Sequence, residues 1–184
     1  MMAGEPRTQL AAAGARLAGA GLIREAEGNL SARIDAESCV VTATGSSTGG
    51  LDFRELVEVR LHGGEIPARA TSEARLHLDL YRRRPEIMAI VHAHPPAVLR
   101  LAENGRLPDA SELEDDEQLF GRPVEVAYFP EGSSALAEAV AAALADACAC
   151  VLLDHGAVTV GTTVEQALRR MLSLERAAIR SAGC

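Results

Sequence analysis

Two hydrophobic patterns along the chain predict a series of short β-strands. Leu30, Ala32 and Ile34 alternate with polar residues, which is typical of a half-exposed strand. Continuous apolar runs at 89–91 and 148–153 are bounded by turn-forming residues and indicate buried strands. Further strands are predicted over 39–43, 57–61, 124–129 and 158–160.

Segments with helical periodicity lie between these strands. The clearest runs over 71–84, with Leu76 and Leu80 in its apolar stripe. Thr71 or Ser72 can cap its start, since a hydroxyl there can accept a bond from a free backbone N–H group. The other helices are predicted over 5–22, over 97–104, from Ser133 or Ser134 to Ala147, and from Thr162 or Thr163 to Ser181.

Composition narrows the class of protein. The chain of 184 residues, 48% of them apolar, suffices for a single domain, 1–184, with a sizeable core. No stretch reaches the ~18 consecutive apolar residues of a membrane span, and the N-terminus lacks a signal-peptide pattern. The net charge of −8, without a basic aromatic patch, argues against nucleic-acid binding. We therefore expect a soluble cytoplasmic protein that binds neither membranes nor nucleic acid.

The chain contains no lysine, because all 18 basic residues are arginine. A lysine Schiff base is therefore excluded as a route to carbon–carbon bond chemistry, and a metal ion is the obvious alternative electron sink. Cys148 and Cys150 lie in an apolar run, so we expect them to be reduced and packed rather than to serve a metal or redox role.

The candidate chemistry centres on A-I-V-H-A-H-P-P at 89–96. His92 and His94 are two residues apart on a predicted strand, so their imidazoles share a face at its C-terminal tip. Such a pair suits a divalent metal such as zinc, although two ordinary surface histidines would give the same pattern. His155 also follows an apolar strand, and Glu73 lies at a helix start, where the helix dipole favours a carboxylate.

Other polar features have weaker interpretations. The loop T-G-S-S-T-G-G at 44–50 offers many N–H groups and hydroxyls, as an anion-binding concavity does, but a plain flexible loop is the alternative. His77, one turn after Glu73, is expected to be structural, and His62 exposed and inert. The acidic run at 109–117 is interpreted as a solvated face or loop.

Taken together, these motifs resemble the class II aldolase/adducin family over about residues 8–181. The matching pieces are G-N-L-S-A-R at 28–33, T-A-T-G at 42–45, T-S-E at 71–73, R-R-P-E-I at 83–87, A-I-V-H-A-H at 89–94, L-L-D-H-G at 152–156, and A-V-T-V-G at 157–161 with T-V-E-Q-A-L behind it. The resemblance implies an α/β fold, a three-layer α/β/α sandwich around a largely antiparallel central sheet. It also implies a homotetramer with the active site between subunits.

The resemblance further implies the roles of individual residues. The matching histidines would hold a metal, most often Zn²⁺ with Mn²⁺ or Co²⁺ as alternatives, and Glu73 would be both a ligand and the catalytic acid/base. A substrate phosphate would sit among the family's matching groups. The implied metal ligands are Glu73, His92, His94 and His155, and the implied phosphate-binding residues are Asn29, Gly45, Thr71 and Ser72.

The function that the resemblance implies is a metal-dependent aldolase. It would cleave or form a small sugar phosphate, through a metal-stabilised enediolate, to give an aldehyde and dihydroxyacetone phosphate. A same-fold epimerase, dehydratase or decarboxylase is the first alternative, and a non-catalytic adducin-like interaction domain is the second. The chain departs from relatives in carrying Glu25 and Glu27 before Gly28-Asn29, where two carboxylates would oppose an anion.

Overall fold

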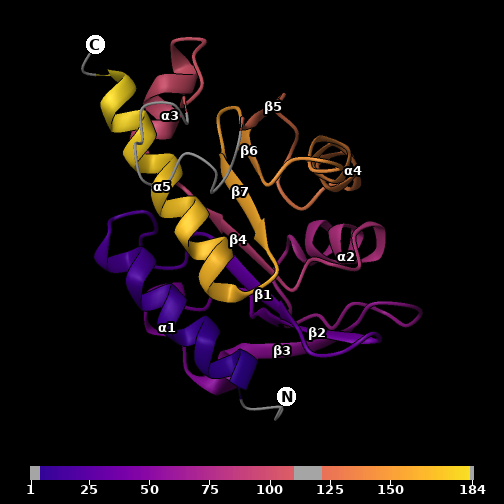
Figure 1. The fold of residues 1–184 in the computed structure, drawn as a ribbon. Helices are drawn as coiled ribbons and strands as arrows, with labels where there is room; N and C mark the ends of the chain where they lie inside the picture. Colours follow the sequence, from indigo (N-terminus) through magenta and orange to yellow (C-terminus); the bar gives the residue numbers. More distant parts are fainter. Residues whose placement is uncertain (1–4, 110–121, 183–184) are drawn as a thin grey trace.

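A computed structural model describes residues 5–109 and 122–182 and has helices on both faces of one sheet (Figure 1). The helices and 3₁₀ turns are α1 Glu5–Gly19, η1 Thr48–Gly50, η2 Phe53–Glu55, α2 Ala74–Arg83, α3 Pro96–Glu103, α4 Ser134–Ala143 and α5 Val164–Ala182. The strands are β1 Asn29–Arg33, β2 Ser38–Thr42, β3 Leu56–Arg60, β4 Ala89–Ala93, β5 Val124–Val126, β6 Ala149–Leu152 and β7 Gly156–Gly161.

The seven strands form one sheet in the order β3-β2-β1-β4-β7-β6-β5. All neighbouring pairs are antiparallel except β5 and β6, which run parallel at the edge. The register places Asn29 of β1 opposite His92 of β4, and His92 opposite Val158 of β7. The start of β1 and the end of β4 therefore lie side by side, next to β7. The antiparallel pairings confirm the expected largely antiparallel α/β fold.

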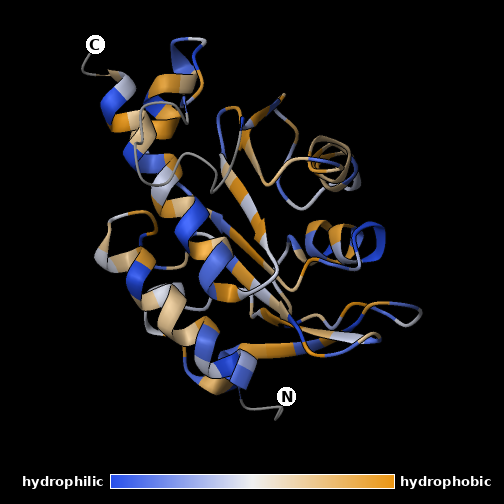
Figure 2. Ribbon diagram, viewed as in Figure 1, coloured by the Kyte–Doolittle hydropathy of each residue, from blue (hydrophilic) through white to orange (hydrophobic). Residues whose placement is uncertain are grey.

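Two hydrophobic clusters, one on each face of the sheet, hold the layers together. Helices α1, α3 and α5 pack on one face through residues such as Leu17, Val98 and Leu174. Helices α2 and α4 cover the other face through Leu80 and Val140, among others. Figure 2 shows the central strands coloured as hydrophobic, with hydrophilic stretches concentrated on the helices and loops. The three-layer α/β/α arrangement follows from this double coverage.

The predicted half-exposed strand is wrong, because all five residues of β1 are buried. The alternation in the sequence is real, but the polar positions face α2 rather than water. Ser31 bonds to the side chains of His77 and Tyr81, and the Arg33 guanidinium donates to two carbonyls. Buried polar groups are tolerated where they find partners, and a short-range pattern does not reveal those partners.

Several predicted boundaries also differ from the structure. The helix predicted over 71–84 begins at Ala74 with Glu73 at the N-cap position, and neither Thr71 nor Ser72 caps it as predicted. The Thr71 hydroxyl instead accepts a long bond, 3.4 Å, from the backbone N–H group of Glu73. The opening helix ends at Gly19 rather than residue 22, and helix α4 ends at Ala143 rather than Ala147. Strand β5 is only three residues long.

Other local predictions are confirmed. Ser133 caps α4 by accepting a bond from the N–H group of Leu136, and Thr163 accepts one from Gln166 at the start of α5. Cys148 and Cys150 are free thiols as expected, but only Cys150 is fully packed, and burial raises its pKa to about 12, whereas Cys148 is half-buried. None of the described helices is long and apolar enough to cross a membrane. Apart from Asp109, the acidic run at 109–117 lies outside the described residues.

Candidate active site

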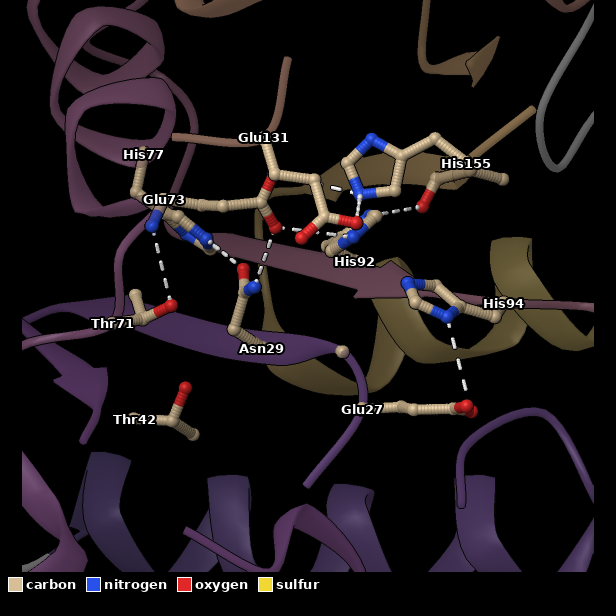
Figure 3. Close-up of polar contacts among 12 residues, drawn as sticks. Glu27, Asn29, Thr42, Thr71, Glu73, His77, His92, His94, Glu131 and His155 are labelled. Carbon is tan, nitrogen blue, oxygen red and sulfur yellow. Dashed lines mark hydrogen bonds and ion pairs between the residues drawn. The ribbon is translucent and has the colours of Figure 1, made fainter. Parts of the chain in front are cut away.

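Three strand ends bring the three candidate histidines together. His92 lies in β4, His94 directly follows that strand, and His155 lies in the turn between β6 and β7. Their ring centroids are 4.8 Å apart for His92 and His155, 5.1 Å for His92 and His94, and 5.6 Å for His94 and His155. Each offers one nitrogen, and these nitrogens all lie within 4.8 Å of one another (Figure 3). The H-x-H pair and the later histidine thus form one cluster.

Glycine at position 156 allows the two strands to approach this closely. A Cβ atom there would lie 2.6 Å from the Ala93 carbonyl oxygen and 2.9 Å from ring carbons of both His92 and His94. Asp154, at the start of the same turn, has a positive φ of 56°, which an aspartate accepts more readily than most residues. The sequence D-H-G therefore makes a tight turn that presses His155 against the β4 histidines.

Glu73 reaches the cluster from the start of α2. Its buried carboxylate accepts a 2.8 Å hydrogen bond at Oε2 from the side-chain amide of Asn29. Oε2 also lies 3.1 Å from His92 Nε2, and Oε1 lies 3.7 Å from His155 Nε2. Burial by itself would raise the pKa of this carboxyl, but the charge that His92 carries at acid pH and the bond from the Asn29 amide outweigh it and leave the pKa below its usual range. Glu73 is therefore ionised near neutral pH.

The protonation state of His92 follows from its other nitrogen. Nδ1 lies 3.0 Å from the Ala157 carbonyl oxygen, which can only accept, so Nδ1 carries the proton. Burial lowers the pKa of His92 to about 4, so the ring is neutral and Nε2 presents a lone pair. That lone pair faces Glu73 Oε2 at 3.1 Å. The contact is therefore between two acceptors and is not a hydrogen bond.

Facing acceptors of this kind fit a metal ion. Among the described residues, Glu73 Oε1 and His92 Nε2 are buried at the cluster without a hydrogen-bond partner, and His155 Nε2 faces Glu73 Oε1 at 3.7 Å. An unpaired buried acceptor costs about 1–3 kcal/mol, and a cation between several of them would remove that cost. Neutral imidazoles with a carboxylate suit zinc, and the bond from His92 Nδ1 to a carbonyl is a common support for a metal-ligating histidine.

The cluster lines a cavity of about 360 Å³. Its lining residues are Ala26, Glu27, Gly28, Asn29, Ala43, Thr44, Gly45, Ser46, Thr71, Ser72, Glu73, His92, His94, Glu131 and His155. All the residues predicted for the metal and phosphate sites are in this set, and no arginine is. The cavity thus offers neutral donors and histidines together with three carboxylates.

The loop predicted to bind an anion divides into two parts. Thr44, Gly45 and Ser46 line the cavity, with Gly45 at a φ of +70°. Residues 48–50 form η1 and pack on α1, where the Thr48 side chain donates to the Gly28 carbonyl. Only the first half of the loop therefore borders the cavity, and the second half is held against α1.

Two further carboxylates flank the histidines. Glu27 Oε2 lies 3.8 Å from His94 Nδ1, whereas Glu25 does not line the cavity. Glu131 Oε1 lies 3.7 Å from His155 Nε2, and its side chain is 70% exposed. Sequence reasoning missed Glu131. The only local signal in the sequence was the glycine at position 132. In the structure Gly132 has a φ of +69° and lies close to the Ser72 carbonyl, which places this turn beside the start of α2.

Comparison with known proteins places these features in a family. The family model described as the class II aldolase and adducin N-terminal domain matches residues 8–180. A 3-oxo-tetronate 4-phosphate decarboxylase of Haemophilus influenzae is 32% identical over 82% of this chain and 74% of its own length. A methylthioribulose-1-phosphate dehydratase of Acidiphilium cryptum is 33% identical over 91% of this chain and 85% of its own.

Solved structures agree with the sequence relatives. The crystal structure of L-fuculose-1-phosphate aldolase from Thermus thermophilus superposes with a TM-score of 0.84 and 27% identity, covering 96% of this chain and 92% of that one. Proteins named as aldolases, decarboxylases and dehydratases thus share the sequence or fold of this chain. The matched region spans all the strands and all the residues of the cavity. The chain therefore belongs to the class II aldolase and adducin N-terminal domain family.

Proposed function

We propose that this protein is a metal-dependent aldolase. It cleaves a small sugar phosphate into an aldehyde and dihydroxyacetone phosphate, or forms the sugar phosphate from these two compounds. The observation that carries the proposal is the contact between two buried acceptors, His92 Nε2 and Glu73 Oε2, 3.1 Å apart beside two more histidines. A non-catalytic interaction domain of the same fold would gain nothing from such a contact, since burying facing acceptors costs stability.

In this proposal the three histidines hold a divalent cation, with Zn²⁺ as the first candidate and Mn²⁺ or Co²⁺ as alternatives. When bound, the cation would act as a Lewis acid that stabilises negative charge on the substrate's carbonyl oxygen. Glu73 is both a ligand and the acid/base. Asn29 holds its Oε2, whereas Oε1 is buried without a hydrogen-bond partner, so Oε1 is the atom proposed to take and return the proton.

Recognition of the phosphate is assigned to neutral groups. Asn29, Gly45, Thr71 and Ser72 contribute an amide, hydroxyls and backbone N–H groups to the cavity, and Ser46 adds another hydroxyl. Because Glu27 and Glu131 border the same space, we propose that binding of the phosphate dianion is weak.

The charge of the cavity favours an aldolase over a decarboxylase. A ketose phosphate brings only its phosphate charge, whereas a phosphorylated 3-oxo acid also brings a carboxylate. The cavity carries three carboxylates and no arginine among its lining residues, so each added negative charge on the substrate is disfavoured by about 1 kcal/mol or more. The decarboxylase named above, 32% identical to this chain, keeps decarboxylation as the second candidate.

The proposal is tested with the metal-loaded protein and two panels of substrates. Ketose 1-phosphates are assayed for release of dihydroxyacetone phosphate, and phosphorylated 3-oxo acids for release of carbon dioxide. We expect turnover with the first panel, and none in a protein stripped of metal. Exclusive turnover of the second panel would replace the aldolase with the decarboxylase. A protein that binds no divalent metal and turns over neither panel would contradict both.

A further inference from the structure

A line of buried polar side chains leads away from Glu73 into the space between α2 and β1. Asn29 Oδ1 lies 2.5 Å from His77 Nε2, and His77 Nδ1 lies 2.6 Å from Ser31 Oγ. Ser31 Oγ in turn lies 2.8 Å from the Tyr81 hydroxyl. None of these four residues is more than 6% exposed. With the Asn29–Glu73 bond, the line has four consecutive hydrogen bonds.

The direction of each bond follows from the one before it. The Asn29 amide nitrogen donates to a carboxylate oxygen of Glu73, so the Asn29 oxygen is the atom that faces His77. His77 Nε2 must then donate to that oxygen. Burial lowers the pKa of His77 to about 3, so the ring is neutral and its Nδ1 accepts from the Ser31 hydroxyl. The Ser31 proton is thereby used, and the Tyr81 hydroxyl donates to Ser31.

We propose that Tyr81, Ser31 and His77 are positioning residues that orient the Asn29 amide and, through it, the carboxylate of Glu73. The proposal rests on the function proposed for Glu73, since an idle carboxylate would need no such support. None of the three residues lines the cavity, so their effect is transmitted through Asn29. Groups that orient a metal site from outside are often worth 10–100-fold in affinity or activity.

The arrangement also ties the helix that carries Glu73 to the strand beside the histidines. Glu73, His77 and Tyr81 are four residues apart along α2 and so share one face of the helix. Asn29 and Ser31 are two residues apart on β1 and share the face that meets it. Asn29 is also the register partner of His92 in β4. The line of side chains therefore sets the position of the acid/base relative to a proposed metal ligand.

The structure requires opposite tautomers for two of the histidines, and this provides a test without any activity. In the metal-free protein labelled with ¹⁵N-histidine, His77 should be the Nε2–H tautomer and His92 the Nδ1–H tautomer. The signal of His77 is identified by its loss in His77→Gln. Finding His77 as the Nδ1–H tautomer would overturn the proposal, because Nε2 could not then donate to Asn29.

Two variants of His77 separate the donated bond from the volume of the ring. Glutamine places an amide N–H group near the position of Nε2, whereas leucine removes the donor at similar size. We expect slow hydrogen exchange of the Asn29 side-chain amide in the wild type and in His77→Gln, and fast exchange in His77→Leu. Equal protection in all three would overturn the proposal.

Kinetics then test the consequence for Glu73. His77→Leu should lower kcat at least about tenfold with little change in KM, and His77→Gln should restore kcat to within about threefold of the wild type. Leu80→Val, on the same helix but outside the line of polar side chains, is the control for lost packing. It should lower the Tm and leave kcat within about threefold of the wild type.

Equal losses of kcat in His77→Gln and His77→Leu would overturn the positioning role. If the wild type turns over no substrate, the proposed function fails, while the tautomer and exchange measurements still decide the hydrogen-bond directions.

Discussion

At the scale of single residues, the two proposed tasks of Glu73 can be separated by substitution. Glutamine keeps the size of the side chain and removes its ionisable group. Three imidazoles can hold zinc without a fourth protein ligand, so Glu73→Gln should keep most of the metal. A positioned acid/base contributes ~10²–10⁴-fold in rate, so kcat should fall at least ~100-fold. Metal content is measured by elemental analysis, and exchange of the substrate's α-proton with solvent deuterium should fall with kcat. Normal exchange with full metal would leave Glu73 as a helix-start carboxylate.

The three histidines have only the proposed task of holding the ion. Alanine at His92, His94 or His155 should therefore abolish metal binding and activity together. His62→Ala is the matched control, because His62 is exposed and does not line the cavity. At a free metal concentration 100 times its Kd, the bound metal stabilises the fold by about 2.7 kcal/mol, which corresponds to a Tm increase of roughly 5–10 °C. Added zinc should raise the Tm of the wild type and of His62→Ala, but not of the other three variants. A uniform response would contradict the assignment.

Glu27 is expected to weaken recognition of a phosphate. Its carboxylate borders the cavity beside His94, but the side chain is 45% exposed, so water screens part of the repulsion. We expect Glu27→Ala to lower KM for a phosphorylated substrate about two- to fivefold, and Glu25→Ala, outside the cavity, to leave it unchanged. The measurement compares phosphorylated and dephosphorylated substrates at matched metal content. Equal KM effects on both would show that the cavity does not recognise phosphate.

At the scale of elements, the site depends on how closely β4 and β7 approach. Gly156 and Gly161 are the two ends of β7, and an added Cβ would clash with backbone at either end, 2.6 Å from Ala93 O or from Ala167 N. Only the Gly156 clash involves the histidine rings. The sequence indicated that His155 follows an apolar strand but gave no sign of this contact between strands.

This pair of glycines yields a matched experiment. Gly156→Ala and Gly161→Ala should each lower the free energy of unfolding by about 1–3 kcal/mol, as overpacking does. Only Gly156→Ala should also weaken metal binding, because β7 must move away from His92 and His94 to accept the methyl group. Denaturant titration and metal titration measure the two effects separately. Equal metal affinity in both variants would show that the site tolerates a shift of β7.

At the scale of the whole molecule, the number of subunits remains a proposal drawn from the family resemblance. A tetramer should give a mass of about four times 19.3 kDa by light scattering at micromolar concentration. If the active site lies between subunits, dilution that dissociates the tetramer should lower the specific activity in parallel. A monomer with full activity would contradict both the assembly and a shared site. That the chain forms a single domain, 1–184, likewise remains a prediction.

The sequence by itself determined the order of the elements and the chemistry placed at their ends. Short periodicities indicate strands and helices, so His92 and His94 at a strand tip and Glu73 at a helix start could be assigned before the fold was known. The absence of lysine left a metal as the obvious electron sink for carbon–carbon bond chemistry. These inferences succeed because they depend only on neighbours in the chain, a few residues apart.

Only the tertiary structure decided what each polar side chain meets. The pattern of β1 predicted a face in water, but that face contacts His77 and Tyr81, which are 46 and 50 residues away from Ser31. The Nδ1–H tautomer of His92 depends on Ala157, 65 residues later, and Glu131 joins the cavity through the packing of its turn on Ser72. Periodicity shows that two faces differ, but the partner that satisfies a buried donor or acceptor comes from elsewhere in the chain, and only the fold brings it there.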